Sequence, residues 1–444
     1  MEDHSKQRLL FKDLGGKTPE ADFEGGEVTS DAGLLLIRET ERRLDLFHRV
    51  AGVIRDGRHQ GYVRHCLEEM LRQRVFQIIA GYEDADDCDA LRQDPAIKMA
   101  CGKRPESDPP LASQPTMSRL ENGVSRTDLY RMALAIGDAF IASYETPPEA
   151  IILDIDDTED ETHGAQQMTL FNAFYDSYCY QPIHIYEGTS GRLITTVLRP
   201  GKRPAGAEIV AILKRVVARI RKAWPGVGII LRADSHYSGP EVMEFCEARD
   251  VKYLLGLPPY KPLVEETRPL RDETRRQYDI LRRPVKLFGE FRYQAGSWTS
   301  PRRVVFKAEH NALGPTVRFV ATNLERAMPS FLYRTAYCGR GRMELFIKEH
   351  KTHLFSDRTS CSRFEANQFR LLLHSLAYVL LHTFRRLHLG GTQWAQAQFD
   401  TIRLKLLKIG ARVRELGTKI KIHLPSSFPW KADLLTIWRS CRSG

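Results

Sequence analysis

The sequence of 444 residues lacks any run of about 18 uncharged apolar residues, which excludes a membrane-spanning helix. Its eight cysteines form no CxxC pair, so neither a disulfide framework nor a zinc ribbon is indicated. A signal peptide has an apolar stretch after its first charged residues, and the first 13 residues of this chain have none. With 42% hydrophobic residues the chain is not disordered either. We therefore expect a soluble, cytoplasmic protein of two to four domains.

Positive charge is concentrated in two segments. The formal net charge is +10, and residues 401–444 carry ten lysines and arginines against two acids. Residues 261–324 carry thirteen against seven, so the remainder of the chain is slightly acidic. Basic regions of this kind favour nucleic acid as the partner, although a basic surface kept for solubility is the alternative.

The hydrophobic periodicity changes along the chain. Residues 1–145 read as mostly helical and are expected to bind DNA. Within them a short helix over 113–122 carries Arg119 and would suit a recognition helix, although a helix without DNA contact fits equally well. Further along, three consecutive strands are followed by a helix, a strand, a helix and a strand. In residue numbers these elements are 150–158, 178–186, 193–198, 207–223, 227–234, 240–249 and 251–257.

That order predicts an α/β fold, a mixed sheet with flanking helices of the ribonuclease H type. We assign its first part to residues 146–260 and its second part to 325–400. Between them, residues 261–324 show short alternating stretches and are predicted to form an inserted antiparallel β-module. Residues 401–444 form a separate basic segment.

Three acids lie at positions in the predicted elements from which their side chains could bind a shared metal ion. Asp156 closes the first strand, Asp234 closes the fourth, and Glu344 lies in the helical stretch after the insertion. Carboxylates at the ends of neighbouring strands converge, and their mutual repulsion calls for cations. Hard oxygen ligands select Mg²⁺ or Mn²⁺, and two such ions can cleave a phosphodiester. Taken one at a time, each acid could equally be an unrelated surface carboxylate.

The residues around Glu344 form a spaced pattern. Tyr337, Arg340, Glu344, Lys348 and Lys351 would fall within roughly 80° of one face of a regular α-helix. Arg340 and Lys351 are suited to bind the phosphates beside a scissile bond. A salt-bridged solvent face is the plainer alternative.

At these residues the sequence resembles the insertion-sequence transposases of the DDE class. Tyr337-x2-Arg340-x3-Glu344-x6-Lys351 matches their Y-(2)-R-(3)-E-(6)-K signature in every spacing. The segments around Asp156 and Asp234 look like the first-acid and second-acid regions of one branch of this group. The resemblance spans about residues 25–430.

This resemblance implies a bacterial enzyme that binds terminal inverted repeats and carries out metal-dependent strand cleavage and transfer. Asp156, Asp234 and Glu344 would hold two Mg²⁺ ions, which Mn²⁺ could replace. Double-stranded DNA at the transposon ends and in the target would be its partner, bound by a homodimer, and DNA-bound molecules would lie with the nucleoid. Because Asp154 and Asp157 crowd the first acid, Asp154 stays open as an alternative ligand.

Other residues are candidates for contacts with DNA. Trp298 could stack on a flipped base, as an aromatic residue in the insertion does in relatives that form a hairpin intermediate, or it could be a core tryptophan. Lys202 could bind DNA or be a solvated loop residue.

Two other functions compete with this interpretation. The run from Asp154 to Thr158 also fits the DxDxT nucleophile motif of haloacid-dehalogenase-like phosphatases, in which Asp154 would be phosphorylated. The downstream acidic pair of that family is missing. The second alternative is a domesticated DNA-binding protein without cleavage activity, which the presence of all three acids disfavours.

Overall fold

The computed structural model describes residues 8–442. The first seven of the 13 N-terminal residues considered above as a possible signal peptide therefore lie outside the described residues. The chain forms two compact units. Unit 1 comprises the chain up to residue 128 together with 353–358 and the residues from 376 onward, and unit 2 comprises 129–352 and 359–375. Across residues 8–442 no helix is long and apolar enough to cross a membrane.

Unit 1 contains both the N-terminal helices and the basic C-terminal segment, which the sequence had placed in separate regions. Strand β15 pairs with β3, so that Arg412 lies opposite Val28. The elements of this unit are β1 (Leu9–Leu10), β2 (Glu20–Ala21), β3 (Val28–Thr29), α1 (Leu34–Leu44), α2 (Leu46–Ala51), η2 (Gln60–Tyr62), α3 (Leu67–Ala80), α4 (Asp87–Leu91), α5 (Pro95–Ala100), α6 (Gln114–Gly123), α15 (Phe399–Ile402), η7 (Arg403–Leu407), β15 (Ala411–Leu416), β16 (Lys419–His423) and α16 (Lys431–Arg442).

Unit 2 is built on an eight-stranded sheet, and the unit boundaries fall within the helices α7 (Arg126–Ala142) and α14 (Phe364–His388). Its other elements are β4 (Ala150–Asp157), β5 (Asp160–Glu161), β6 (Leu170–Asn172), β7 (Ser177–Tyr180), β8 (Ile183–Glu187), β9 (Leu193–Val197), α8 (Gly206–Ala223), β10 (Gly228–Ala233), η3 (Ser235–Tyr237), α9 (Pro240–Ala248), β11 (Lys252–Leu257), α10 (Lys261–Glu266), α11 (Arg268–Leu281), β12 (Val285–Tyr293), β13 (Arg302–Asn311), β14 (Gly314–Thr322), α12 (Pro329–Phe331), η4 (Leu332–Tyr337), η5 (Cys338–Gly341), α13 (Arg342–Lys348) and η6 (Glu349–His353).

The sheet has the strand order β12-β13-β14-β11-β10-β4-β8-β9. Strands β4, β8 and β9 are antiparallel neighbours, whereas β10 and β11 run parallel to β4 and are reached through the helices α8 and α9. Central parallel strands are buried on both faces and are therefore apolar, as β4 and β10 are. This arrangement confirms the predicted mixed α/β fold of the ribonuclease H type.

Helix α8 shows why the sequence pattern located the elements of this core well. Four of its residues, Ile209, Leu213, Val217 and Ile220, repeat at helical spacing and are buried in the core that also contains strands β4 and β10. The helix also has Glu208 in its first turn, where a carboxylate favours the helix dipole.

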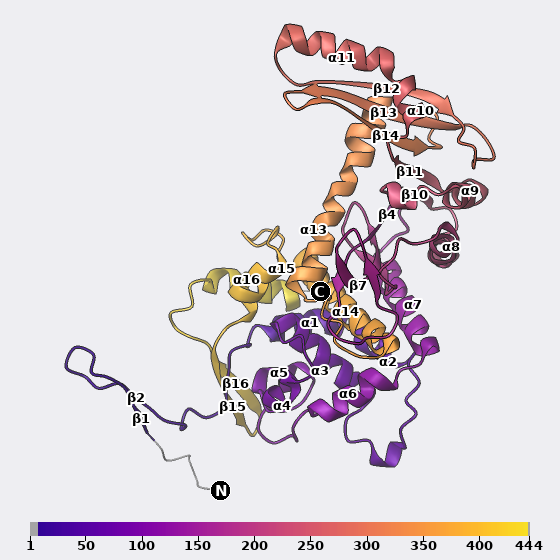
Figure 1. Cartoon of the computed structure of the whole chain (residues 1–444). Helices are drawn as coiled ribbons and strands as arrows, with labels where there is room; N and C mark the ends of the chain where they lie inside the picture. Colours follow the sequence, from indigo (N-terminus) through magenta and orange to yellow (C-terminus); the bar gives the residue numbers. More distant parts are fainter. Residues whose placement is uncertain (1–7, 443–444) are drawn as a thin grey trace. The chain divides into compact units, whose positions relative to one another are not determined.

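Residues 261–324 differ from the predicted inserted β-module in two ways. The segment begins with two helices, α10 and α11, and α11 lies alongside β12 and β13 (Figure 1). In addition, β14 pairs with β11, so that Thr322 lies opposite Leu254 and the three strands extend the core sheet. Alternating hydrophobicity identifies strands but carries no information about the sheet that they join.

Between residues 329 and 353 one continuous helical segment changes its winding several times. The π-helix η4 is followed by the 3₁₀-helix η5, the α-helix α13 and the π-helix η6. Departures of this kind from α-helical geometry are uncommon and often mark functional sites or hinges. The whole predicted signature, from Tyr337 to Lys351, lies on this segment.

Candidate active site

Asp156 and Asp234 lie side by side at the ends of two parallel strands. Ile155 of β4 pairs with Ala233 of β10, which places the next residue of each strand in adjacent positions. The pKa of Asp156 is raised to about 6, chiefly by burial; the charges of Asp234 and Asp157 also raise it, and Arg340 lowers it. The predicted convergence of these two acids is therefore present in the structure.

Arg340 is the immediate partner of this pair. Its Nη1 donates a hydrogen bond to Oδ2 of Asp156 over 2.6 Å, and only about a sixth of either side chain is exposed (17% and 16%). The guanidinium supplies the positive charge that two neighbouring carboxylates require. The other oxygen of Asp156, Oδ1, accepts a hydrogen bond from the backbone N–H of Asp157. Because a carboxylate oxygen can accept more than one hydrogen bond and the ion pair uses one guanidinium nitrogen, both groups retain capacity to bind a ligand.

Tyr337 reaches the same place because Gly256 has no side chain. A Cβ atom on Gly256 would lie 2.5 Å from the Tyr337 hydroxyl and 3.2 Å from the backbone nitrogen of Ser235. Burial raises the pKa of Tyr337, Arg340 lowers it and Asp234 raises it, which places all three groups in one electrostatic environment. The first two residues of the signature thus contact or adjoin the acidic pair.

Lys351 also serves the region of the first acid. Its ammonium group donates a hydrogen bond to the backbone carbonyl of Glu159, two residues after β4 ends. Lys348, by contrast, is exposed on α13.

Glu344 is exposed on α13, and the structure does not bring it together with the other two acids. Among residues 8–442, no group of three or more histidine, cysteine, aspartate or glutamate side chains is placed to hold a metal ion. The expected common face assumed a regular turn of about 100° per residue, which η5 and the π-helices on either side do not follow. The three-carboxylate site thus stays a prediction.

Asp154 occupies a different environment from Asp156. It is fully buried, and its two oxygens accept hydrogen bonds from Nε and Nη2 of Arg232, both over 2.6 Å. The remaining Nη1 of Arg232 donates to the carbonyl of Ala336, which ties the helical segment to the sheet. With both oxygens engaged, Asp154 is unavailable as a metal ligand or as a phosphorylated nucleophile in this conformation. An arginine within an otherwise apolar strand was the sequence signal for this pair.

Asp157 contacts neither arginine and instead interacts with Tyr237 and His236. It accepts a hydrogen bond from the buried Tyr237 hydroxyl over 2.7 Å, and Nδ1 of His236 lies 3.8 Å away. The interaction with Asp157 raises the pKa of His236. Arg203 completes this loop by donating to the carbonyls of Ser235 and His236. These contacts hold the turn that follows Asp234.

The remaining predicted DNA contacts are spread over the molecule. Trp298 is only 8% exposed, with Tyr293 against its edge and Arg302 over its ring, so the core alternative describes it in this conformation. Lys202 is exposed in the loop before α8. Arg119 is exposed on α6, where it donates a hydrogen bond to the hydroxyl of Thr116.

The pair of acids fits a magnesium ion in chemistry and in number. Mg²⁺ is commonly held by one or two carboxylates, and substrate phosphates and water complete its coordination. Asp156 and Asp234 provide two such carboxylates, and the charge of Asp234 adds to the rise in the pKa of Asp156 that burial causes. The donor set therefore suits one divalent ion shared with a phosphate.

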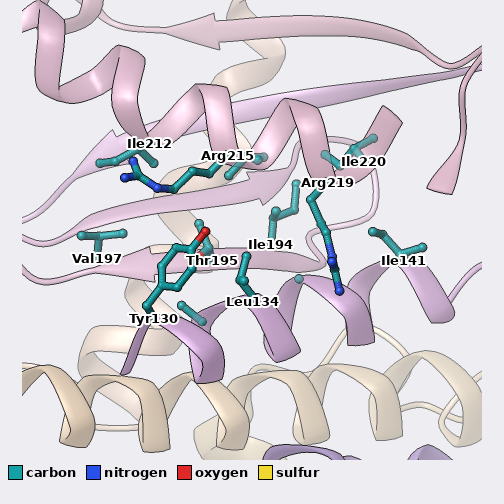
Figure 2. Close-up of a pocket in the computed structure, with 13 residues that line it drawn as sticks. Tyr130, Leu134, Ile141, Ile194, Thr195, Val197, Ile212, Arg215, Arg219 and Ile220 are labelled. Atoms are coloured by element: carbon teal, nitrogen blue, oxygen red, sulfur yellow. The ribbon is translucent and has the colours of Figure 1, made fainter. Parts of the chain in front are cut away.

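An apolar cavity of about 220 Å³ lies elsewhere in unit 2, between α7, α8 and the edge strand β9 (Figure 2). Aliphatic side chains such as Leu134, Ile194 and Ile212 line it, and Arg219 extends from α8 to an ion pair with Asp138 of α7. Neither Asp156 nor Asp234 contributes to it. The cavity is therefore separate from the acidic pair.

The family description "Transposase DDE domain group 1" matches residues 11–442. None of the curated proteins matches the sequence. Among solved structures, a piggyBac transposase synaptic complex with hairpin DNA aligns with a TM-score of 0.43 and 12% identity, over 85% of this chain and 79% of that chain.

Proposed function

The chain belongs to the family of DDE transposases, and we propose that it is the transposase of a bacterial insertion sequence. In this proposal it binds terminal inverted repeats, cleaves DNA there and transfers the freed strand to target DNA. The observation that supports it is the pairing of Asp156 with Asp234 at the ends of two parallel strands, next to Arg340 and Tyr337.

We assign the metal to the same acids. Asp156 and Asp234 would hold Mg²⁺, or Mn²⁺ in its place, and Glu344 would be the third carboxylate needed for a second ion. When bound, the ions activate the attacking oxygen and stabilise the leaving oxygen of the phosphodiester.

The side chains around the acids then bind and orient the DNA. Arg340, which donates one hydrogen bond to Asp156, has further donors that would bind a phosphate beside the scissile bond. Tyr337 would donate its hydroxyl hydrogen bond to the same phosphate group. Lys351, by contacting the Glu159 carbonyl, would hold the chain after Asp156 in position.

Glu344 would join the pair when DNA is bound. The 3₁₀-helix η5 directly precedes α13, and a 3₁₀ turn within a longer helix is a common hinge. A small change of winding there would rotate Glu344 relative to Arg340. Lys348, Lys202 and Arg119 would add sequence-independent contacts with phosphates, and two ends would be held by a homodimer.

The test is Glu344→Gln in the full-length protein, with Glu325→Gln as the control because Glu325 is also exposed, in an exposed ion pair with Arg292. We expect Glu344→Gln to abolish nicking of end-containing DNA in Mg²⁺ or Mn²⁺, while binding of the ends in a mobility-shift assay is retained. The Glu325→Gln variant should keep both activities.

Two results would contradict this assignment. Loss of DNA binding in Glu344→Gln would make the residue structural. Wild-type protein that binds ends and never cleaves them with either metal would be a DNA-binding protein without catalytic activity.

A further inference from the structure

The first described segment of unit 1, residues 8–28, leaves its apolar side chains in solvent. Every residue of this N-terminal arm is exposed. Six of them are large and apolar, and each is between 47% and 76% exposed: Leu9, Leu10, Phe11, Leu14, Phe23 and Val28. A concentration of exposed apolar side chains of this size marks an interaction surface.

The arm is nevertheless ordered by its own contacts. Strands β1 and β2 pair so that Leu9 lies opposite Ala21, and Thr18 donates a hydrogen bond to Asp13. The turn between them uses Gly15 and Gly16 at positive φ. The arm therefore presents a preformed hairpin to a partner, which lowers the entropy lost on docking.

Unit 1 also contains an apolar groove, and none of the arm residues 8–28 lines it. It has a volume of about 880 Å³ and is formed by α1, β16, α16 and the segment after α5. Its exposed apolar residues include Ile420, Leu424, Leu435 and Trp438. A groove of this size and composition is suited to binding large apolar side chains.

The charges of the two surfaces are complementary. The N-terminal arm carries five acids against three basic residues, and four of the acids lie in residues 18–28, where two of them flank Phe23. The groove is lined by four cations and one acid: Arg38, Lys103, Arg104, Arg442 and Glu39. Most of these cations already have a partner, such as Asp108 for Arg104 and Glu69 for Lys103, so their contribution is to orientation more than to affinity.

Both surfaces belong to one unit of one chain, yet they do not cover each other in the single chain. The base of the arm is fixed, since Val28 and Thr29 pair with Arg412 and Ala411 of β15. We propose that two copies of this chain form a closed dimer in which the N-terminal arm of each copy docks in the apolar groove of the other. Such an exchange is isologous, so it stops at two copies.

The first experiment measures the dimer dissociation constant of the full chain by light scattering over a concentration series, without DNA. We expect a dimer for the wild type and at least about tenfold weaker association for Phe23→Asp and for Trp438→Glu. Leu313→Asp is the matched control, because Leu313 is 96% exposed in the turn between β13 and β14 of unit 2. Circular dichroism would confirm that each variant folds. A wild type that is monomeric at all concentrations, or equal association of all variants, would overturn the proposal.

The second experiment identifies what the arm contacts. A benzophenone amino acid replaces Phe23 in an isotopically light copy, which is mixed with a heavy wild-type copy and irradiated. We expect cross-linked peptides that join residue 23 of the light copy to residues 420–438 of the heavy copy. Cross-links confined to one copy would show docking in cis, and cross-links to another surface or to added DNA alone would show another partner. Each of these results would overturn the exchange.

Discussion

Two aspartate–arginine pairs lie two residues apart on strand β4 and differ in nearly every physical respect. Asp154 is fully buried within the strand, and both of its oxygens bind Arg232. Asp156 lies near the end of the strand, partly open to solvent, and contacts Arg340 through one nitrogen. One guanidinium comes from the neighbouring strand and the other from a helical segment of variable winding.

This difference distinguishes an aspartate that stabilises the fold from one that is available to bind a ligand. A buried, doubly hydrogen-bonded ion pair cannot exchange its partner without leaving a charge uncompensated. A partly exposed pair with one hydrogen bond can exchange Arg340 for a metal ion or a phosphate at much lower cost. By this reasoning we propose Asp156 as the acid that takes part in the reaction, whereas Asp154 joins the sheet to the helical segment through Arg232.

The largest effect on cleavage should follow from removing the charge of either carboxylate at the ends of β4 and β10. We expect Asp156→Asn and Asp234→Asn each to lower metal-dependent cleavage by about 10³-fold or more, since a metal ligand is lost while the fold is kept. The wild type should gain thermal stability on addition of Mn²⁺, and both variants should lose this gain. Asp176→Asn is the control, because Asp176 is exposed and has the positive φ that asparagine tolerates. A full thermal shift in Asp156→Asn would remove Asp156 from the metal site.

The next largest effect is on stability and concerns the buried ion pair between Asp154 and Arg232. Asp154→Asn should destabilise the protein by about 3 kcal/mol, because it leaves the Arg232 charge buried and unpaired. The double variant Asp154→Leu with Arg232→Met should recover most of this loss. Denaturant unfolding of the three proteins measures it. A stable Asp154→Asn protein that no longer cleaves DNA would instead make Asp154 a ligand, and would reverse the comparison.

The smallest effect on cleavage should come from shifting Tyr337, which brings the helical segment next to Asp156 and Asp234. Gly256→Ala would place a methyl group 2.5 Å from the present position of the Tyr337 hydroxyl, which would have to move. We expect cleavage to fall by about tenfold, or about 1.4 kcal/mol in the barrier, with end binding largely kept. Gly296→Ala is the control, since nothing lies within 4 Å of its Cβ position. Unchanged cleavage in Gly256→Ala would mean that the position of Tyr337 is unimportant to the reaction.

Much of the fold could be predicted because its signals are local. The apolar runs that end in Asp156 and Asp234 identify two strands, and the period of α8 identifies the crossover between them. The convergence of the two acids followed from the parallel order of those strands. The structure places the signature residues Tyr337 and Arg340 next to this pair, and their role as DNA contacts stays a prediction.

What the sequence determined by itself was the type and order of the main core elements between residues 150 and 257 and the charged residues that they carry, since periodicity and residue type are properties of short segments. Only the tertiary structure decided that β14 joins β11, that Arg232 engages Asp154 and leaves Asp156 to Arg340, and that Glu344 is exposed. Each of these depends on which partner is nearest in space or on how the helix winds between residues 332 and 353. Pairing and winding are set by the packing of distant segments, and no local pattern encodes them.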